Sequence, residues 1–219
     1  MIAEKLVSDD LIPLRTSDTG EEALEMMNEF YVRHLPIVNN RQLLGLISED
    51  DILDFDATEA VGSYSLSLTR PYVKSSDHIY EVMRILAESF LTLVPVVDEE
   101  NNYIGVITQE SLLRYFANTT AFAEHGSILV LEVQRHDYSL TEIARIIESE
   151  NVLILSVFIA SDETASTIDI TIKTNAQNLQ AVIATFERFN YNIKASFNEA
   201  DYMDSLKERY DSLMMYLNV

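Results

Sequence analysis

The chain has 219 residues, 47% of them hydrophobic and 23% charged, which is the composition of a folded protein rather than a disordered or fibrous one. Fifteen Lys and Arg residues against 36 Asp and Glu residues give a formal net charge of −21, which disfavours nucleic acid and anionic membranes as partners. The absence of cysteine excludes disulfides, thiolate nucleophiles and cysteine-ligated metal sites.

The length fits one large domain or two small ones. The first residues lack the apolar core of a secretory signal, and no apolar run approaches the ~18 residues of a membrane span. We therefore expect a cytoplasmic protein with no membrane and no nucleic-acid partner.

An internal repeat organises the first half of the chain. Leu35–Val38 and Leu44–Ser48 recur as Val94–Val97 and Ile104–Thr108, with Pro and Gly at matching places. In each copy a helix precedes two short strands joined by a polar turn, and a second helix follows from Glu49 or Gln109. The apolar positions of the first helices are Ala23, Leu24, Met27, Phe30 and Tyr31 in one copy and Ile79, Val82, Met83, Leu86 and Phe90 in the other. Two units this small are expected to pack together as a pseudo-symmetric pair.

This repeat resembles tandem CBS domains, an arrangement called a Bateman module, with two βαββα-type units at residues 1–58 and 59–120. In nucleotide-binding members, a Gly-x-x-Ser/Thr-x-x-Asp turn holds the sugar and phosphate of adenosine ligands. Gly45, Ser48 and Asp51 match that turn position by position. The resemblance therefore implies a regulatory site for AMP, ATP or S-adenosylmethionine in the first copy.

The same turn also has a purely structural interpretation. Ser48 and Asp51 at a helix start have the spacing of a capping box, in which both side chains bond the backbone, and the two interpretations are about equally supported. The second copy keeps Gly105 and Thr108 of the motif, but Ser111 replaces the carboxylate. We expect the second site to be weaker or empty.

Basic residues precede the first proline strand. Arg33, His34 and Pro36 resemble the positions from which some CBS members reach ligand phosphates, and a local Arg with a titratable His supplies the counter-charge that a phosphate requires. The alternative is a solvated corner in which Arg33 pairs with an acidic neighbour such as Glu29.

No arrangement typical of catalysis or of a metal site is found. The acidic clusters Glu49–Asp51 and Asp98–Glu100 lack the spacing of an EF-hand loop and are explained by a helix start and a turn tip. No phosphate loop, nucleophile elbow or dinucleotide-binding motif occurs. We expect a protein that is not an enzyme and has no metal and no obligatory cofactor. The histidines lack metal-ligand spacing: His34, His78, His125 and His136.

A second unit follows a linker at residues 119–126 that ends in glycine. Its third strand alternates strictly between isoleucine and polar residues, which predicts a sheet with one face on the core. The order βαββαβ is that of a ferredoxin-like fold, so the whole chain is expected to be α+β. The predicted elements are strands at Ile128–Val133, Val152–Ala160, Thr167–Lys173 and Tyr191–Phe197 and helices at Leu140–Glu150 and Leu179–Phe189.

Residues 127–198 resemble an ACT domain, a regulatory module that often binds amino acids at the loop between its first strand and first helix. The corresponding loop contains Asp137 and Ser139, a possible effector site. The family's usual Pro-Gly after the Asp is replaced by Tyr138-Ser139, which lacks the conformational freedom of glycine. A CBS pair followed by an ACT domain is also the order of acetoin-utilisation-type regulatory proteins.

Residues 199–219 predict a C-terminal amphipathic helix. Its apolar stripe either packs on its own chain, the favoured interpretation, or docks on a partner. The stripe consists of Tyr202, Leu206, Tyr210, Leu213 and Leu217.

Together these features predict a regulatory sensor that binds an adenosine-containing ligand at the CBS pair, forms a homodimer and acts on an unknown regulated protein. The alternative is a structural self-association protein whose ligand sites have degenerated. Ser111 and Ser139, which replace family residues, favour that alternative.

Overall fold

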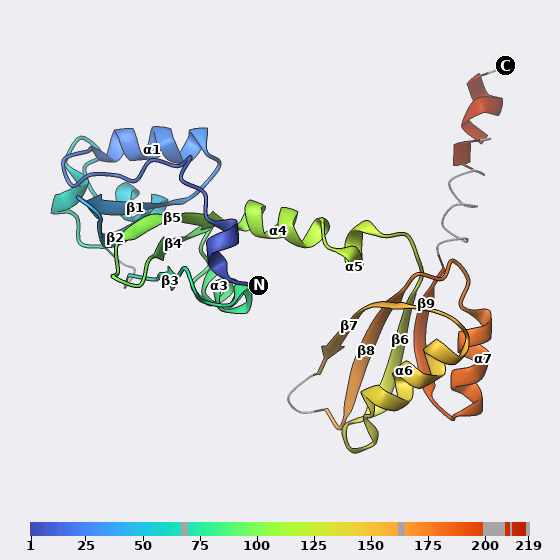
Figure 1. The fold of residues 1–219 in the computed structure, drawn as a ribbon. Helices are drawn as coiled ribbons and strands as arrows, with labels where there is room; N and C mark the ends of the chain where they lie inside the picture. The colour runs from blue at the N-terminus through green and yellow to red at the C-terminus, as the bar shows by residue number, and fades with distance from the viewer. Residues whose placement is uncertain (67–69, 162–164, 199–208, 211, 218–219) are drawn as a thin grey trace. The chain divides into compact units, whose positions relative to one another are not determined.

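The computed structural model describes all residues except 67–69, 162–164, 199–208, 211 and 218–219. The chain forms two compact units, Met1–Phe116 and Ala117–Val219 (Figure 1).

The first unit contains both copies of the repeat, and both second helices begin where the sequence predicts. α1 starts at a capping box formed by Thr19 and Glu22. The first copy has α1 (Gly20–Glu29), β1 (His34–Asn39), β2 (Gln42–Ser48) and α2 (Glu49–Leu53). The second has β3 (Val73–Lys74), α3 (Ile79–Glu88), β4 (Leu93–Val97), β5 (Tyr103–Thr108) and α4 (Gln109–Ala117), and 3-10 turns lie at Ala3–Leu6 and Val61–Ser63.

The two copies share one core, which confirms the predicted pairing. β1 and β2 form one antiparallel hairpin and β4 and β5 another, with β3 parallel to β4. The N-terminal segment crosses to the second copy, where Ser8 pairs with Val106. Leu35, Leu46 and Leu93 are fully buried in a single cluster, and each such side chain contributes about 1.5–3 kcal/mol relative to exposure.

Two aromatic residues do not belong to the helix faces where the sequence pattern placed them. α1 ends at Glu29 and α3 at Glu88, so Tyr31 and Phe90 lie beyond the helices. Both have left-handed backbones, with φ of 54° and 53°, and both side chains are exposed. The reversal of the chain after each helix requires that conformation, and helical periodicity does not encode it.

The second unit is the predicted βαββαβ fold. The strand order is β7-β8-β6-β9 with antiparallel neighbours, and α6 and α7 cover the same face of the sheet (Figure 1). The predicted linker contains a short helix, α5 (Thr120–Ala123), which the sequence pattern did not indicate. The elements are β6 (Ile128–Gln134), a 3-10 turn at Arg135–Asp137, α6 (Leu140–Ser149), β7 (Ile154–Ala160), β8 (Thr167–Thr174), α7 (Gln180–Arg188) and β9 (Asn192–Phe197).

The predicted alternation of β8 is confirmed, because Ile168, Ile170 and Ile172 are buried beneath the helices. The C-terminal helix falls partly outside the described residues, including Tyr202 and Leu206. Residues 209–210 and 212–217 are helical. The described stripe residues Tyr210, Leu213 and Leu217 are exposed rather than packed on their own chain.

Candidate functional site

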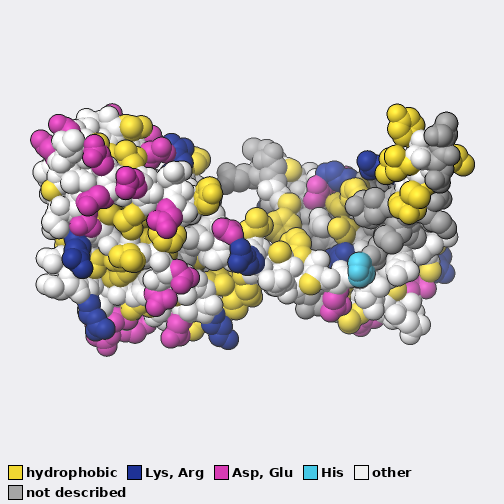
Figure 2. Space-filling view, turned by 90° about the horizontal axis from the view of Figure 1, so that it is seen from above, with side chains coloured by type: hydrophobic (Ala, Val, Ile, Leu, Met, Phe, Trp, Pro, Cys, Tyr) yellow, Lys and Arg dark blue, Asp and Glu magenta, His cyan; other side chains and the backbone are white. Residues whose placement is uncertain are grey.

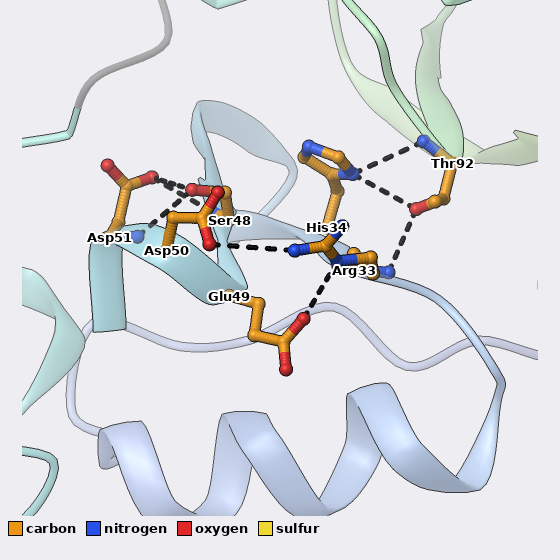
Figure 3. Close-up of polar contacts among 7 residues, drawn as sticks. All are labelled: Arg33, His34, Ser48, Glu49, Asp50, Asp51 and Thr92. Atoms are coloured by element: carbon orange, nitrogen blue, oxygen red, sulfur yellow. Dashed lines mark hydrogen bonds and ion pairs between the residues drawn. The ribbon is translucent and has the colours of Figure 1, made fainter. Parts of the chain in front are cut away.

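The turn from β2 into α2 holds Ser48 and Asp51 in a capping box (Figure 3). The Asp51 Oδ2 atom accepts hydrogen bonds from the Ser48 backbone N–H at 2.9 Å and from the Ser48 hydroxyl at 2.7 Å. The Asp51 N–H donates to the Ser48 Oγ at 3.1 Å. The capping-box interpretation of Ser48 and Asp51 is therefore confirmed. Both residues are buried, so the capping carboxylate is largely removed from water.

Arg33 reaches toward the same helix start. Its Nε atom donates to Glu49 at 2.8 Å, and its Nη2 atom lies 3.5 Å from Asp50 (Figure 3). The hydrogen bond that Arg33 donates to Glu49, followed by the negative charges of Glu49 and Asp50, raises the pKa of Arg33. The acidic partners are therefore residues of α2 rather than Glu29. The guanidinium group remains exposed, which keeps it accessible to an anion.

His34 connects the two copies of the repeat. Its Nδ1 atom accepts a hydrogen bond from the Thr92 backbone N–H at 3.2 Å and lies 3.0 Å from the Thr92 hydroxyl oxygen. The same hydroxyl oxygen accepts a hydrogen bond from the Arg33 backbone N–H at 2.9 Å (Figure 3). Because a backbone N–H only donates, Nδ1 carries no proton and the neutral ring is protonated at Nε2. Burial, followed by the nearby Arg33 charge, lowers the pKa of His34, with Asp51 and Asp50 acting in the opposite direction.

Three predicted site residues, Arg33, His34 and Ser48, line a common hollow of about 270 Å³. Asp51 lies beside it through its bonds to Ser48, whereas Pro36 is buried in β1 opposite Leu46. The other lining residues are Glu49, Asp50, Ser89 and Phe90, so the second copy contributes to the wall.

Gly45 pairs with Ile37 across the β1–β2 hairpin and does not line the hollow of about 270 Å³. A Cβ atom on Gly45 would lie 2.7 Å from the Leu66 side chain, and the Arg70 Nε donates to the Leu44 carbonyl oxygen at 2.6 Å. Leu66 and Arg70 therefore flank the motif glycine. The sequence pattern did not indicate them because they belong to the connection between the copies, outside the repeated strands.

The second copy forms its cap without a carboxylate. The Thr108 N–H donates to the Ser111 Oγ at 3.1 Å, and the Ser111 N–H donates to the Thr108 Oγ1 at 3.0 Å. A Cβ atom on Gly105 would lie 2.5 Å from the Ser8 carbonyl oxygen. The backbone of the N-terminal segment therefore occupies the space beside this glycine.

The possible effector loop of the second unit lies at a polar hollow of about 560 Å³ that Asp137 lines. Ser139 is the N-cap of α6 and accepts the Glu142 N–H at 3.3 Å. The Tyr191 hydroxyl donates to Glu142 at 2.8 Å, and burial together with that carboxylate raises the pKa of Tyr191 to about 12. The hollow is rich in carboxylates: Glu132, Asp137 and Glu142.

Within the described ranges, no group of three or more His, Asp or Glu side chains is arranged to hold a metal ion. No described helix is long and apolar enough to pass through a bilayer.

The CBS domain family model matches residues 3–58 and 63–118, and the chain belongs to this family. Two curated relatives come from Methanocaldococcus jannaschii. The uncharacterised protein MJ0188 is 29% identical over 105 residues, 48% of this chain and 40% of that protein. Inosine-5'-monophosphate dehydrogenase is 28% identical over 116 residues, 51% of this chain and 23% of the enzyme. The chain thus spans less than half the length of either relative.

A solved CBS domain pair/ACT domain protein from Thermotoga maritima is also similar. It is 25% identical, with a TM-score of 0.48, and the match covers 53% of this chain and 96% of that protein.

Proposed function

We propose that the protein is a non-enzymatic regulatory sensor that binds an adenosine-containing ligand, of the AMP, ATP or S-adenosylmethionine class, at the first CBS copy. The observation that carries the proposal is the buried carboxylate of Asp51. The second copy closes the equivalent cap with Thr108 and Ser111, so capping does not require a carboxylate. Burying a charge has an energetic cost, which a role in ligand binding accounts for.

The surrounding groups suit such a ligand. A carboxylate is a strong acceptor for ribose hydroxyls, and the exposed guanidinium of Arg33 is a bidentate donor for a phosphate. The first turn of α2 does not add free donors at Glu49 and Asp51, because their N–H groups donate to the Arg33 carbonyl oxygen and to Ser48 Oγ. The carboxylates of Glu49 and Asp50 compete with a ligand phosphate for Arg33. The net charge of −21 favours a monophosphate or a sulfonium compound over a triphosphate, because repulsion grows with ligand charge.

The second copy is proposed to bind weakly or not at all. Ser111 supplies one hydroxyl in place of a carboxylate, and Ser8 fills the space beside Gly105. We expect one nucleotide per chain.

Asp51→Ser provides a matched test, because it copies a cap that this fold already uses in the second copy. Calorimetric titration with AMP, ATP and S-adenosylmethionine should show affinity lowered about 10-fold or more in Asp51→Ser, since a charged hydrogen bond contributes roughly 1.5–3 kcal/mol. Ser111→Ala is the control and should leave the affinity unchanged. Equal affinity of the wild type and Asp51→Ser contradicts the assignment of Asp51.

The ferredoxin-like unit is proposed to be an ACT domain that serves association or signal transmission, and the protein is proposed to be a homodimer that controls an unidentified protein. The βαββαβ order and the strand arrangement support this domain assignment. Ligand occupancy of the CBS site affects the rest of the protein only if the ligand binds one arrangement of the domains more tightly than another.

The second candidate function is a scaffold whose CBS and ACT surfaces serve only self-association. The capping box supports it, because the cap already gives Ser48 and Asp51 Oδ2 a structural role. Ligand response separates the two functions, whereas oligomer mass does not.

A further inference from the structure

The sheet of the second unit has one face that α6 and α7 do not cover, and the short helix α5 contacts its edge strand β7. Strand register arranges this open face in three rows of side chains. The first two, the apolar rows, have five apolar side chains among eight, and the third row is mainly polar. The rows, taken across β7, β8, β6 and β9, are Ser156, Lys173, Ile128 and Phe197; Phe158, Thr171, Val130 and Ala195; and Ala160, Asp169, Glu132 and Asn192.

Two aromatic side chains of the apolar rows are exposed, Phe158 at 67% and Phe197 at 61%. A hollow of about 530 Å³ adjoins the first row, lined by Ile128, Lys173 and Phe197 together with residues 122–126. The polar row is already paired, since Lys194 bonds Asp169 at 2.5 Å and Asn192 bonds Glu132 at 3.0 Å. The apolar rows therefore form an uncovered patch with a polar rim, which is typical of a docking surface.

The helical residues near the C-terminus form a second uncovered apolar surface (Figure 2). Tyr210, Leu213 and Leu217 follow helical spacing and are 60%, 54% and 64% exposed. A helix of this length is marginal in water unless its apolar face packs against something. The helix therefore requires a surface to cover.

The two surfaces match in size. The eight described helical residues correspond to about 12 Å of helix, and four strands span about 14 Å across the sheet. The ten residues 199–208 connect the end of β9 to the helix and reach at most about 33 Å. A single chain leaves both surfaces exposed. In a dimer with two-fold symmetry, the helix of each chain docks on the sheet of the other, so both surfaces are covered in both chains.

We propose that the C-terminal helix of each chain docks on the apolar rows of the open sheet face of a second copy. Leu213 and Leu217 then lie against Phe158 and the centre of the sheet, near Thr171. This interface specifies the proposed homodimer, and its test does not depend on ligand binding.

The natural absence of cysteine permits a direct test. Two differently tagged full-length chains, one carrying Thr171→Cys and the other Leu213→Cys, are co-expressed and treated with a short bismaleimide. The expected product is a covalent dimer that contains both tags. Leu113→Cys, on the exposed face of α4, replaces Leu213→Cys in the control and should give no such product.

Sedimentation supplies the second measurement. Leu213→Ser combined with Leu217→Ser should convert the dimer to a species of half the mass, whereas Ile12→Ser, at an equally exposed apolar position of the first unit, should not. The proposal is overturned if the mixed chains do not cross-link. It is also overturned if one chain carrying both cysteines links only to itself, or if the double serine variant keeps the wild-type mass.

Discussion

The bridge between His34 and Thr92 predicts how the pairing of the two CBS copies responds to mutation. Thr92→Val keeps the shape of the side chain but removes the hydroxyl that accepts the Arg33 N–H at 2.9 Å and contacts His34 Nδ1 at 3.0 Å. Losing the exposed bond from the Arg33 N–H and the part-buried contact with His34 Nδ1 together costs about 1–2 kcal/mol. For a unit of this size, the unfolding midpoint should fall by roughly 3–8 °C.

The same bridge predicts a pH dependence with a definite sign. The pKa of His34 is lowered in the folded protein, so the unfolded chain takes up the proton first as the pH falls below 6.5. The contribution of neutral His34 to the free energy of unfolding is complete above pH 6.5. As the pH falls toward the folded-state pKa, this contribution is lost by at most about 1.4 kcal/mol per pH unit.

Urea unfolding of the wild type, Thr92→Val and His34→Gln between pH 7.5 and 5 measures both effects. His34→Gln retains an acceptor but does not titrate, so the difference in unfolding free energy between the wild type and this variant should shrink as the pH is lowered. Thr58→Val, which removes an exposed hydrogen bond, should change stability by less than about 0.5 kcal/mol. A pH-independent difference between the wild type and His34→Gln would refute the bridge.

Three further predictions concern other parts of the CBS pair. Tyr103→Phe should raise the unfolding free energy by about 1 kcal/mol in urea titrations, because the buried Tyr103 hydroxyl has no partner among the described residues; a loss of stability would contradict this. Gly105→Ala should lower the unfolding free energy by at least about 2 kcal/mol, since the new Cβ would lie 2.5 Å from the Ser8 carbonyl oxygen on a backbone with φ of 150°. Unchanged stability would show that the N-terminal segment around Ser8 moves freely. Glu49→Gln should leave the unfolding midpoint unchanged yet raise AMP affinity by about twofold to fivefold in calorimetry, because it releases Arg33; weaker binding would assign the binding role to Glu49.

Local patterns encode much of this fold. The matching residues around Pro36 and Pro95 predict both hairpins, and the isoleucine alternation of β8 predicts the covered face of the second sheet. These features depend on residues close together in the chain, which is why periodicity reports them.

The candidate site was less predictable because its contacts cross between the copies. The bond from Arg33 N–H to Thr92 joins residues 59 positions apart, and no spacing rule connects them. The spacing of Ser48 and Asp51 fits both a helix cap and a ligand-binding turn, so only the geometry showed that the cap is formed. The left-handed backbone of Tyr31 was likewise hidden, because an aromatic residue gives no glycine-like signal.

The central claim is that the CBS pair senses an adenosine-containing ligand, and thermal unfolding of the full chain, purified free of nucleotide, tests it most directly. The panel is adenosine, AMP, ADP, ATP, NADH and S-adenosylmethionine, each near millimolar concentration. A ligand present at 100 times its Kd adds ~2.7 kcal/mol, which predicts a midpoint raised by roughly 5–10 °C with at least one compound. In Asp51→Ser, the 10-fold or greater loss of affinity should reduce that shift to about half or less. No shift with any compound would contradict the sensor and favour the scaffold.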